Sequence, residues 1–263
     1  MVIARKRFGQ HFLEAAWVTK LIDALHVTSA DTFLEIGPGR GALTIPLAAR
    51  AGAVIAIEID RDLATLLTER QLANVRVIEG DFLGVDLASA LRDEPHPLRV
   101  VGNLPYNVSS PILFTLLKAA DDGRMFSDAT LMLQKEVADR LVAKPGSKDY
   151  GALAIQVAVA ADVDHVLTLP PGAFRPPPKV TSAVVRLRFR PPTVDVGDRA
   201  AFERVVRGMF LQRRKTVGNA LRPVADSFGR SAAELLAHAQ VDPSKRPEEL
   251  SLAEIARISR AVL

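Results

Sequence analysis

Between residues 32 and 142, short apolar runs alternate with segments of helical periodicity, and this alternation restricts the possible folds more than any other feature of the chain. The runs expected to form strands are 32–36, 53–59, 74–79, 98–102 and 129–133. The segments expected to form helices are 14–27, 42–50, 61–72, 85–92, a segment opening at Ser109-Ser110-Pro111, and 135–142. Strands that alternate with helices through short loops form a mostly parallel sheet covered on both faces.

Two prolines set local conditions on these helices. A proline in a helix interior costs about 3 kcal/mol, so Pro46 requires the regular helix to begin near Thr44. In Ser109-Ser110-Pro111 we expect a serine N-cap with Pro111 at the first helical position.

The pattern changes after Tyr150-Gly151. Residues 152–169 form a long run rich in Val and Ala with no recognisable helix between strands, and 182–189 alternate as a strand after a proline-rich connector. Two strands joined without a crossover helix must be antiparallel, so we expect an antiparallel last strand.

Beyond Pro191-Pro192 the sequence shows only helical signals. The expected helices are 198–211, 213–221, 231–239 and 251–263, and the last two open with the capping boxes Ser231-x-x-Glu234 and Ser251-x-x-Glu254. We therefore predict an α/β domain over residues 1–190 and a small all-α domain over residues 191–263.

Composition excludes several classes of protein. The chain of 263 residues has no cysteine, which excludes disulfides and thiolate metal sites, and its 5 histidines lack the spacing of metal ligands. No apolar stretch approaches about 18 residues and the N-terminus lacks a secretory signal, so we expect a cytoplasmic protein with neither membrane nor metal. The formal charge of +4 suits a polyanionic partner.

A glycine-rich turn, Gly37-Pro38-Gly39-Arg40-Gly41, follows the first strand and is the first candidate binding site. Gly-x-Gly-x-Gly alone fits a nicotinamide cofactor equally well. Glu58 and Asp81, at the ends of the next two strands, can accept from ribose hydroxyls and from an adenine amine. Each carboxylate taken alone is typical of a solvated loop residue. Together with Glu35 before the glycines, the two favour S-adenosylmethionine over a nicotinamide cofactor.

A second candidate site is Asn103-Leu104-Pro105-Tyr106, directly after the fourth strand. A fixed amide carbonyl beside an aromatic face suits a planar base with an exocyclic amine. A plain strand-to-loop turn is the alternative, because Asn and Pro are common turn residues.

Six motifs, spread in order from residue 6 to residue 216, carry a family resemblance. They are Lys6–Leu13 (KRFGQHFL), Glu35–Gly39 (EIGPG), Gly102–Asn107 (GNLPYN), Leu133–Val137 (LQKEV), Phe174–Val180 (FRPPPKV) and Gln212–Thr216 (QRRKT). The chain resembles the ribosomal RNA adenine N6,N6-dimethyltransferase family, and within it the small-subunit branch more than the macrolide-resistance branch.

The resemblance implies a Rossmann-like methyltransferase sheet and assigns roles to residues. It assigns cofactor contacts to His11, Leu13, Gly37, Gly39, Glu58, Asp81 and Asn103; many relatives have Asn at the position of His11. It places the flipped target adenine between Tyr106 and Phe174. The Asn103 side-chain carbonyl and the backbone carbonyl of Leu104 or Pro105 would accept from the N6 amine and turn its lone pair toward the sulfonium methyl, so that positioning and electrostatics carry the rate.

Basic residues form the candidate RNA surface, although a solvated basic helix face is the plain alternative. They are Arg5, Lys6, Arg7, Arg207, Arg213, Arg214 and Lys215. Phosphate contacts of this kind make affinity fall with salt.

The resemblance implies dimethylation of two adjacent adenosines in the hairpin near the 3′ end of small-subunit (16S) rRNA, by a monomer acting on the immature 30S subunit. Three alternatives stay open. They are methylation of large-subunit rRNA, an RNA-binding factor that has lost the chemistry, and a protein or DNA amine methyltransferase. Intact Gly37, Glu58, Asp81, Asn103 and Tyr106 argue against the second, and Leu104 argues against the third, which usually has proline there.

Overall fold

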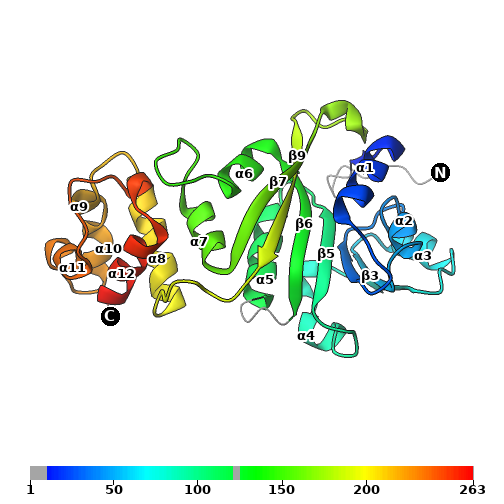
Figure 1. Ribbon diagram of the computed structural model, residues 1–263, viewed down its shortest axis with the longest axis horizontal. Helices are drawn as coiled ribbons and strands as arrows, with labels where there is room; N and C mark the ends of the chain where they lie inside the picture. The colour runs from blue at the N-terminus through cyan, green and yellow to red at the C-terminus, as the bar shows by residue number, and fades with distance from the viewer. Residues whose placement is uncertain (1–10, 121–124, 263) are drawn as a thin grey trace. The chain divides into compact units, whose positions relative to one another are not determined.

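The computed structural model describes residues 11–120 and 125–262, and the chain divides into two compact units (Figure 1). The sheet unit comprises residues 1–138 and 162–191, and the helical unit comprises residues 139–161 and 192–263. The helical unit thus includes residues 139–161, which we expected to belong to the α/β domain over residues 1–190. Arg5, Lys6 and Arg7 lie outside the described residues.

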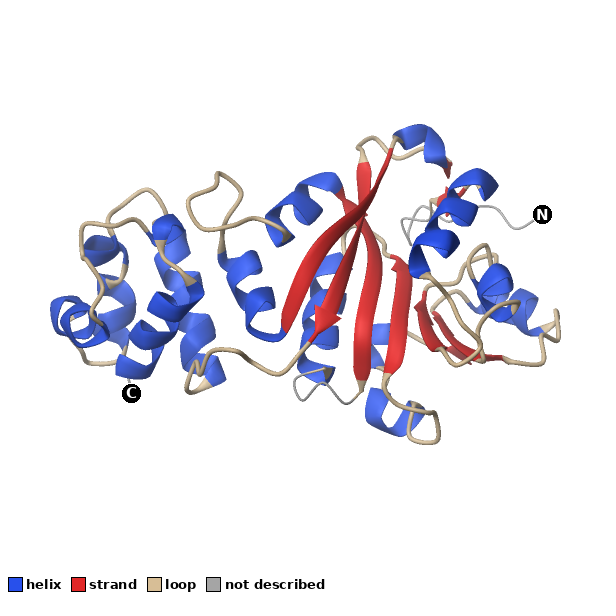
Figure 2. Cartoon of the chain, in the orientation of Figure 1, coloured by secondary structure: helices blue, strands red, loops and turns tan. Residues whose placement is uncertain are grey.

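A sheet forms the centre of the sheet unit (Figure 2). It has seven strands in the order β4-β3-β2-β5-β6-β9-β7. Its strands are β2 (Thr32–Ile36), β3 (Ala53–Glu58), β4 (Val75–Glu79), β5 (Leu98–Asn103), β6 (Phe126–Gln134), β7 (Ala161–Leu169) and β9 (Ser182–Phe189). Neighbours from β4 to β6 pair in parallel, and β9 runs antiparallel to β6. The predicted mixed sheet with an antiparallel end is confirmed.

Helices of the sheet unit follow the predicted alternation. They are α1 (Ala15–Leu25), α2 (Thr44–Ala48), α3 (Arg61–Thr68), α4 (Leu87–Ala90), α5 (Ser109–Ala119) and α6 (Lys135–Leu141), whose end enters the helical unit; short 3-10 turns are η2 (Phe82–Gly84) and η3 (Pro171–Ala173). Helix α2 begins at Thr44, so Pro46 lies in the first turn, where its missing N–H costs no intrahelical bond. Helix α5 differs from the prediction, because it begins at Ser109 after Val108 and has no side-chain cap.

A separate two-stranded sheet joins distant parts of the chain. Strand β1 (Phe12–Leu13) pairs antiparallel with β8 (Phe174–Arg175), with Leu13 opposite Phe174. Leu13 and Phe174 are both buried in the core beside α1. The N-terminal segment from residue 11 is therefore anchored to the proline-rich connector.

The expected strand over 152–169 is wrong in its first half. Residues Ala152–Ala160 form α7, and only Ala161–Leu169 form β7. An apolar run without periodicity does not distinguish a buried strand from a buried helix. Ile155 and Val159 of α7 pack into the core of the helical unit with Phe202 and Val206, so tertiary burial outweighs the strand propensity of its valines.

The helical unit encloses its own apolar core. Its other helices are α8 (Arg199–Leu211), α9 (Val217–Ala220), α10 (Arg222–Ser227), α11 (Ala232–Ala239) and α12 (Leu252–Ala261), with the 3-10 turn η4 (Pro247–Glu249). The capping box of Ser251 and Glu254 forms, whereas Ser231 makes no side-chain cap. The predicted helix 213–221 is reduced to α9, and α10 was not expected.

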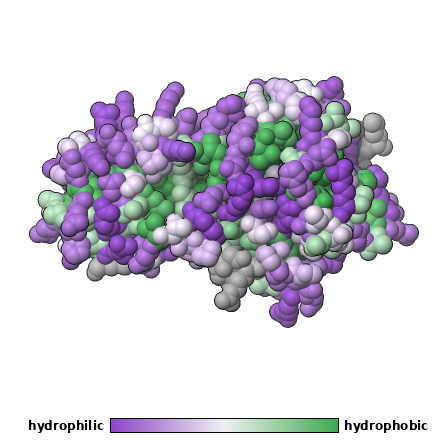
Figure 3. Space-filling model, viewed as in Figure 1, coloured by the Kyte–Doolittle hydropathy of each residue, from purple (hydrophilic) through white to green (hydrophobic). Residues whose placement is uncertain are grey.

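Hydrophilic residues cover most of the face shown in Figure 3. Among the described residues, no helix is both long and apolar enough to span a membrane. Within the same ranges, no group of three or more His, Asp or Glu side chains is arranged to hold a metal ion.

Candidate active site

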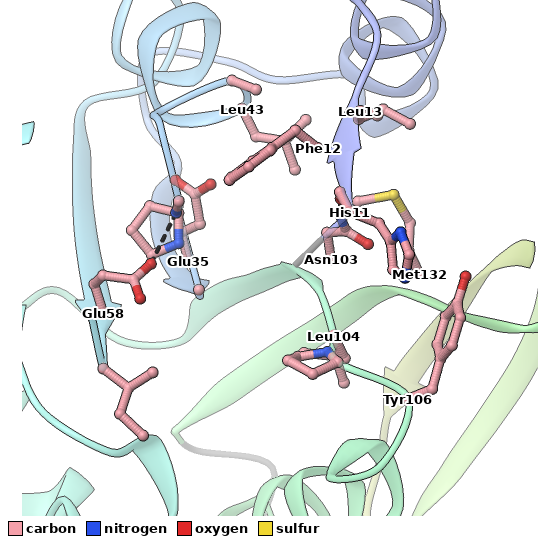
Figure 4. A pocket seen from close by; sticks show the side chains of 16 residues that line it. His11, Phe12, Leu13, Glu35, Leu43, Glu58, Asn103, Leu104, Tyr106 and Met132 are labelled. Atoms are coloured by element: carbon pink, nitrogen blue, oxygen red, sulfur yellow. Dashed lines mark hydrogen bonds between the residues drawn. The ribbon is translucent and has the colours of Figure 1, made fainter. Parts of the chain in front are cut away.

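A cavity of about 90 Å³ lies at the carboxyl ends of β2, β3 and β5, where open α/β sheets bind ligands (Figure 4). Its walls come from β1, the glycine-rich turn after β2, the end of β3, and the segment after β5. Pockets for small ligands measure about 300–1,000 Å³, so this one is too small as it stands for a nucleoside-sized molecule. His11 and the two residues of β1 form one part of the wall.

Phe12 is the part of β1 that lies against the glycine-rich turn. A Cβ atom on Gly39 would come within 3.1 Å of the Phe12 ring, and the Arg40 guanidinium sits 4.3 Å from the centre of that ring. Gly39 also has a φ of +60°, which side chains rarely adopt. Glycine at this position therefore serves both the turn and the close approach of the N-terminal strand.

Glu58 holds the glycine-rich turn in place. Its side chain is 3% exposed, and its two oxygens accept from the backbone N–H groups of Gly39 (2.8 Å) and Asp60 (2.8 Å). Burial raises the pKa of Glu58, and these N–H donors partly offset the rise. A carboxylate has further lone pairs, so Glu58 retains capacity for another donor.

Glu35 lies in the cavity wall with its carboxyl group almost completely buried. Burial raises the pKa of Glu35 to about 7, opposed by Thr44 and supported by the nearby charge of Glu58. Its Oε2 atom has no hydrogen-bond partner among the described residues. A buried acceptor without a partner suits a cationic group on a ligand.

Asn103 ends β5 and turns its amide toward β1. Its Nδ2 donates to the backbone carbonyl of His11 at 2.6 Å. Since only the nitrogen can donate to a carbonyl, this bond fixes the orientation of the amide. The Oδ1 atom makes no hydrogen bond with the described residues, and neither does the backbone carbonyl of Leu104, whereas the Pro105 carbonyl accepts from Val108 at 3.1 Å.

Tyr106 presents a fixed aromatic face to the same cavity. Its hydroxyl shares a 2.6 Å hydrogen bond with Ser182, and burial raises its pKa. The His11 ring stacks on it with 5.9 Å between ring centres and 23° between planes. His11 is held there by Nδ1, which lies 2.7 Å from the carbonyl of Pro176.

Two residues of the sequence-based site lie elsewhere. Phe174 is 1% exposed and packs in the core below β1, outside the cavity wall, because β8 places it opposite Leu13. Asp81 is exposed, and its Oδ1 accepts from Leu83 at the start of η2. The remaining cofactor and catalytic candidates line the one cavity: His11, Leu13, Gly37, Gly39, Glu58, Asn103, Leu104, Pro105 and Tyr106.

Met132 and Ser182 belong to this site but were not found from the sequence. Met132 lines the cavity because it pairs with Asn103 in the register of β5 and β6. Ser182 begins β9 and holds Tyr106. Neither residue has a distinctive motif, and only the register of the strands brings them to the site.

The described basic residues of the candidate RNA surface divide into two groups. The side chain of Arg213 is already bonded within the helical unit, because it forms a 2.5 Å ion pair with Glu248 and donates to the backbone carbonyl of Lys148. Arg207, Arg214 and Lys215 are exposed, and their side chains make no ion pair or hydrogen bond with the described residues.

Comparison with known proteins finds relatives that match almost the whole chain. Residues 1–262 match the family model described as ribosomal RNA adenine dimethylase. Ribosomal RNA small subunit methyltransferase A of Xanthomonas oryzae is 46% identical over 97% of this chain and 95% of its own length. The protein of the same name from Pseudomonas aeruginosa is 45% identical over 97% of this chain and 93% of its own.

Two solved structures share the architecture. A dimethyladenosine transferase from Plasmodium falciparum superimposes with a TM-score of 0.79 and 27% identity, covering 94% of this chain and 96% of that one. The 23S rRNA methyltransferase ErmE gives a TM-score of 0.67 and 27% identity, covering 95% of this chain and 99% of that one.

Proposed function

Because the chain belongs to the ribosomal RNA adenine dimethylase family and is an S-adenosylmethionine-dependent methyltransferase, we propose a substrate for it and a role for each residue of its site. It transfers methyl groups to the N6 amines of two adjacent adenosines in the hairpin near the 3′ end of small-subunit rRNA. The product is N6,N6-dimethyladenosine, formed on the immature 30S subunit during ribosome assembly. The 46% identity to a relative named for the small subunit supports this choice over the large subunit.

S-adenosylmethionine supplies an electrophilic methyl group on a sulfonium. The residues present fit such a molecule, because the unpartnered Oε2 of Glu35 can receive a cationic group in a buried wall. We assign cofactor contacts to residues of the cavity wall: His11, Leu13, Gly37, Gly39, Glu58 and Asn103. We also keep Asp81 as a cofactor contact, although its exposed carboxylate lies outside that wall, at the start of η2. Because the cavity is small, β1 must shift outward before the cofactor enters, and it then covers the site again.

The orientation of the Asn103 amide is the observation that carries the proposal. With Nδ2 bound to the His11 carbonyl at 2.6 Å, Oδ1 is left as an acceptor for one hydrogen of the target amine. The free backbone carbonyl of Leu104 is the better second acceptor, since the Pro105 carbonyl already serves Val108. Two acceptors on one amine draw its nitrogen toward tetrahedral geometry and direct its lone pair at the methyl group.

Tyr106 provides the stacking face for the target base. Ser182 fixes the ring from its hydroxyl end, which lowers the entropy lost when a base stacks. The His11 ring covers that face, so base entry requires the His11 side chain to turn away while its backbone carbonyl stays on Asn103. Phe174 is buried outside the cavity, and we do not retain it as the opposite wall of the base site.

Methylation of separated ribosomal subunits tests the proposal. Small and large subunits from cells lacking the modification are incubated with the protein and methyl-labelled S-adenosylmethionine, and nucleosides from each rRNA are analysed by mass spectrometry. We expect N6,N6-dimethyladenosine in small-subunit rRNA alone. Label only in the large subunit, or in neither, would overturn the proposal.

A further inference from the structure

The amide of Asn103 depends on one contact for its orientation. The backbone of Asn103 is fixed at the end of β5, where it pairs with Met132 of β6, and the N–H of Leu104 donates to the Met132 carbonyl at 3.3 Å. The Asn103 side chain makes one hydrogen bond with residues 11–120 and 125–262, from Nδ2 to the backbone carbonyl of His11. The sheet therefore places the residue, and His11 decides which way the amide faces.

The orientation of Asn103 matters because an amide has a donor end and an acceptor end. A half-turn about its last side-chain bond exchanges Oδ1 and Nδ2 with almost no change of shape. In the observed orientation Oδ1 can accept from an amine, whereas the opposite orientation presents N–H groups to a group that is itself a donor. Without its partner on His11, the amide would face the wrong way for part of the time.

The His11 carbonyl belongs to a segment that is anchored along one side. We call residues 11–13 the N-terminal strap. The strap joins the proline-rich connector through the pairing of β1 with β8, and through His11 Nδ1, which lies 2.7 Å from the Pro176 carbonyl. Just beyond the strap, the N–H of Glu14 donates to the Ala173 carbonyl at 2.9 Å. None of these anchoring bonds involves the glycine-rich turn or the end of β5.

Side chains from two other parts of the wall hold the strap against the cavity. Arg40 of the glycine-rich turn stacks on Phe12 at 4.3 Å from the ring centre, and the same ring lies against Gly39. Asn103, at the end of β5, binds the His11 carbonyl. The strap therefore contacts both the turn assigned to the cofactor and the amide assigned to the target amine.

We propose that the N-terminal strap is a positioning element for methyl transfer. The His11 backbone carbonyl orients the Asn103 amide, so the amine site is complete only while the strap is closed. The proposal rests on the proposed function, because it takes the N6 amine as the group that Asn103 receives. When the His11 ring turns off Tyr106 to admit the base, its carbonyl stays in place. Opening of the strap for cofactor exchange releases the amide and suspends transfer.

A simpler role for the strap is a cover that only retains the cofactor, and the two roles differ in their kinetics. Weakening a cover lowers the affinity for the cofactor but leaves the transfer rate at saturation unchanged. Weakening a positioning element lowers that rate. The effect of a positioning carbonyl must also vanish when the Asn103 amide is absent, because the carbonyl acts through it.

An amide-to-ester replacement weakens the His11 carbonyl without altering a side chain. Phenyllactic acid in place of Phe12, introduced by nonsense suppression, turns that carbonyl into an ester carbonyl, which is a poorer acceptor. We expect single-turnover methylation of small subunits at saturating S-adenosylmethionine to slow about three- to tenfold, the contribution of one hydrogen bond. Leucic acid in place of Leu13 weakens the next carbonyl of the strap instead and is the matched control.

The same ester in the Asn103→Ala background should cause no further slowing. Equal slowing in the wild-type and Asn103→Ala backgrounds would overturn the proposal, because the carbonyl would then act independently of the amide. An unchanged rate for the Phe12 ester, with only a loss of cofactor affinity, would reduce the strap to a cover.

Hydrogen exchange tests the bond between Asn103 and His11 without methyl transfer. Asn103→Asp keeps the size of the side chain but cannot donate to the His11 carbonyl. The backbone N–H groups of residues 12–14 should therefore exchange about three- to tenfold faster than in wild type. Asn107→Asp adds the same charge at an exposed position of the same segment and is the matched control. Wild-type exchange rates in Asn103→Asp would overturn the proposal.

The two measurements distinguish this proposal from the proposed function. If the wild-type protein methylates small subunits but the Phe12 ester does so at the wild-type rate, the role of the strap alone is wrong. If the wild-type protein does not methylate small subunits, the proposed function fails. Hydrogen exchange then still decides whether Asn103 holds the strap.

Discussion

The cavity at the carboxyl edge of the sheet and the basic end of α8 both gather polar side chains, but they differ in how those side chains are bonded. In the cavity most polar atoms already have partners: Glu58 holds two N–H groups, Asn103 holds His11, and Tyr106 holds Ser182. Few acceptors remain free, chiefly Glu35 Oε2 and Asn103 Oδ1.

At the end of α8 the situation is reversed. Arg214 and Lys215 have no partner in the described part of the chain, and Leu211 is exposed. Methyl transfer needs atoms placed within a fraction of an ångström, which a bonded network provides. Phosphate and ribose contacts tolerate adjustment, so mobile, unpaired side chains suffice for them. The difference predicts that substitutions in the cavity change the rate of transfer, the stacking of the target base or the stability of the fold. Substitutions of the unpaired cations after α8 should instead change the salt-dependent affinity for rRNA.

Asn103→Ala should produce the largest effect. It removes the acceptor that faces the amine, and losing one such preorganised group costs about 10²–10³-fold in kcat. Affinity for S-adenosylmethionine, measured by calorimetry, should stay within a few fold of wild type. Transfer at the wild-type rate would show that the amide does not position the amine.

Glu35→Gln tests whether burial in the cavity raises the pKa of Glu35 and makes its ionisation destabilise the folded protein. The folded carboxyl keeps its proton up to about pH 7, whereas the unfolded one loses it near 4.5, so the folded state binds more protons between these values. The contribution of Glu35 to the unfolding free energy is therefore greatest below pH 4.5. It falls as the pH rises toward 7 and is constant at higher pH. From pH 5 to pH 8 the unfolding free energy of wild type should therefore drop about 2–3 kcal/mol more than that of Glu35→Gln.

Urea unfolding at both pH values measures this difference. Parallel pH profiles for the two proteins would mean that Glu35 ionises normally in the folded state. Glu69→Gln, on the exposed end of α3, is a matched control that removes a carboxyl outside the cavity.

Tyr106→Ala should weaken rRNA recognition by the stacking free energy of one base, about 1–3 kcal/mol. The effect appears as a raised KM for small subunits. Tyr106→Phe is the matched control, because it keeps the ring and loses only the hydroxyl bonded to Ser182. Equal KM values for Tyr106→Ala and Tyr106→Phe would remove the ring from the base site.

We expect the smallest effects from Arg213→Ala and Arg214→Ala, which remove two adjacent arginines that have different surroundings. Loss of the partly exposed Arg213–Glu248 pair and its carbonyl bonds should lower the unfolding free energy by about 1–2 kcal/mol. Arg214→Ala should leave stability within about 0.5 kcal/mol and reduce the salt slope of subunit binding by about 0.7–0.9. If Arg214→Ala lowered the stability and Arg213→Ala instead changed the salt slope, the roles given to the two arginines would be wrong.

Local patterns in the sequence were enough to predict the fold class and most of the residues that line the cavity. Alternating strands and helices require a parallel sheet, and such a sheet brings the glycine-rich turn, Glu58 and Asn103 to one edge. These conclusions depend on local periodicity and on topology, both of which are written into consecutive residues.

Contacts between side chains far apart in the chain could not be predicted from local patterns. Phe174 has the residue type of a base-stacking ring, but its register opposite Leu13 buries it. Arg213 and Arg214 are the same residue type, but Arg213 contacts Glu248, 35 positions along the chain, and the backbone carbonyl of Lys148. Residues 152–160 form a helix whose Ala154, Ile155 and Val159 pack into the core of the helical unit. Pairings of this kind depend on long-range packing, which no local pattern records.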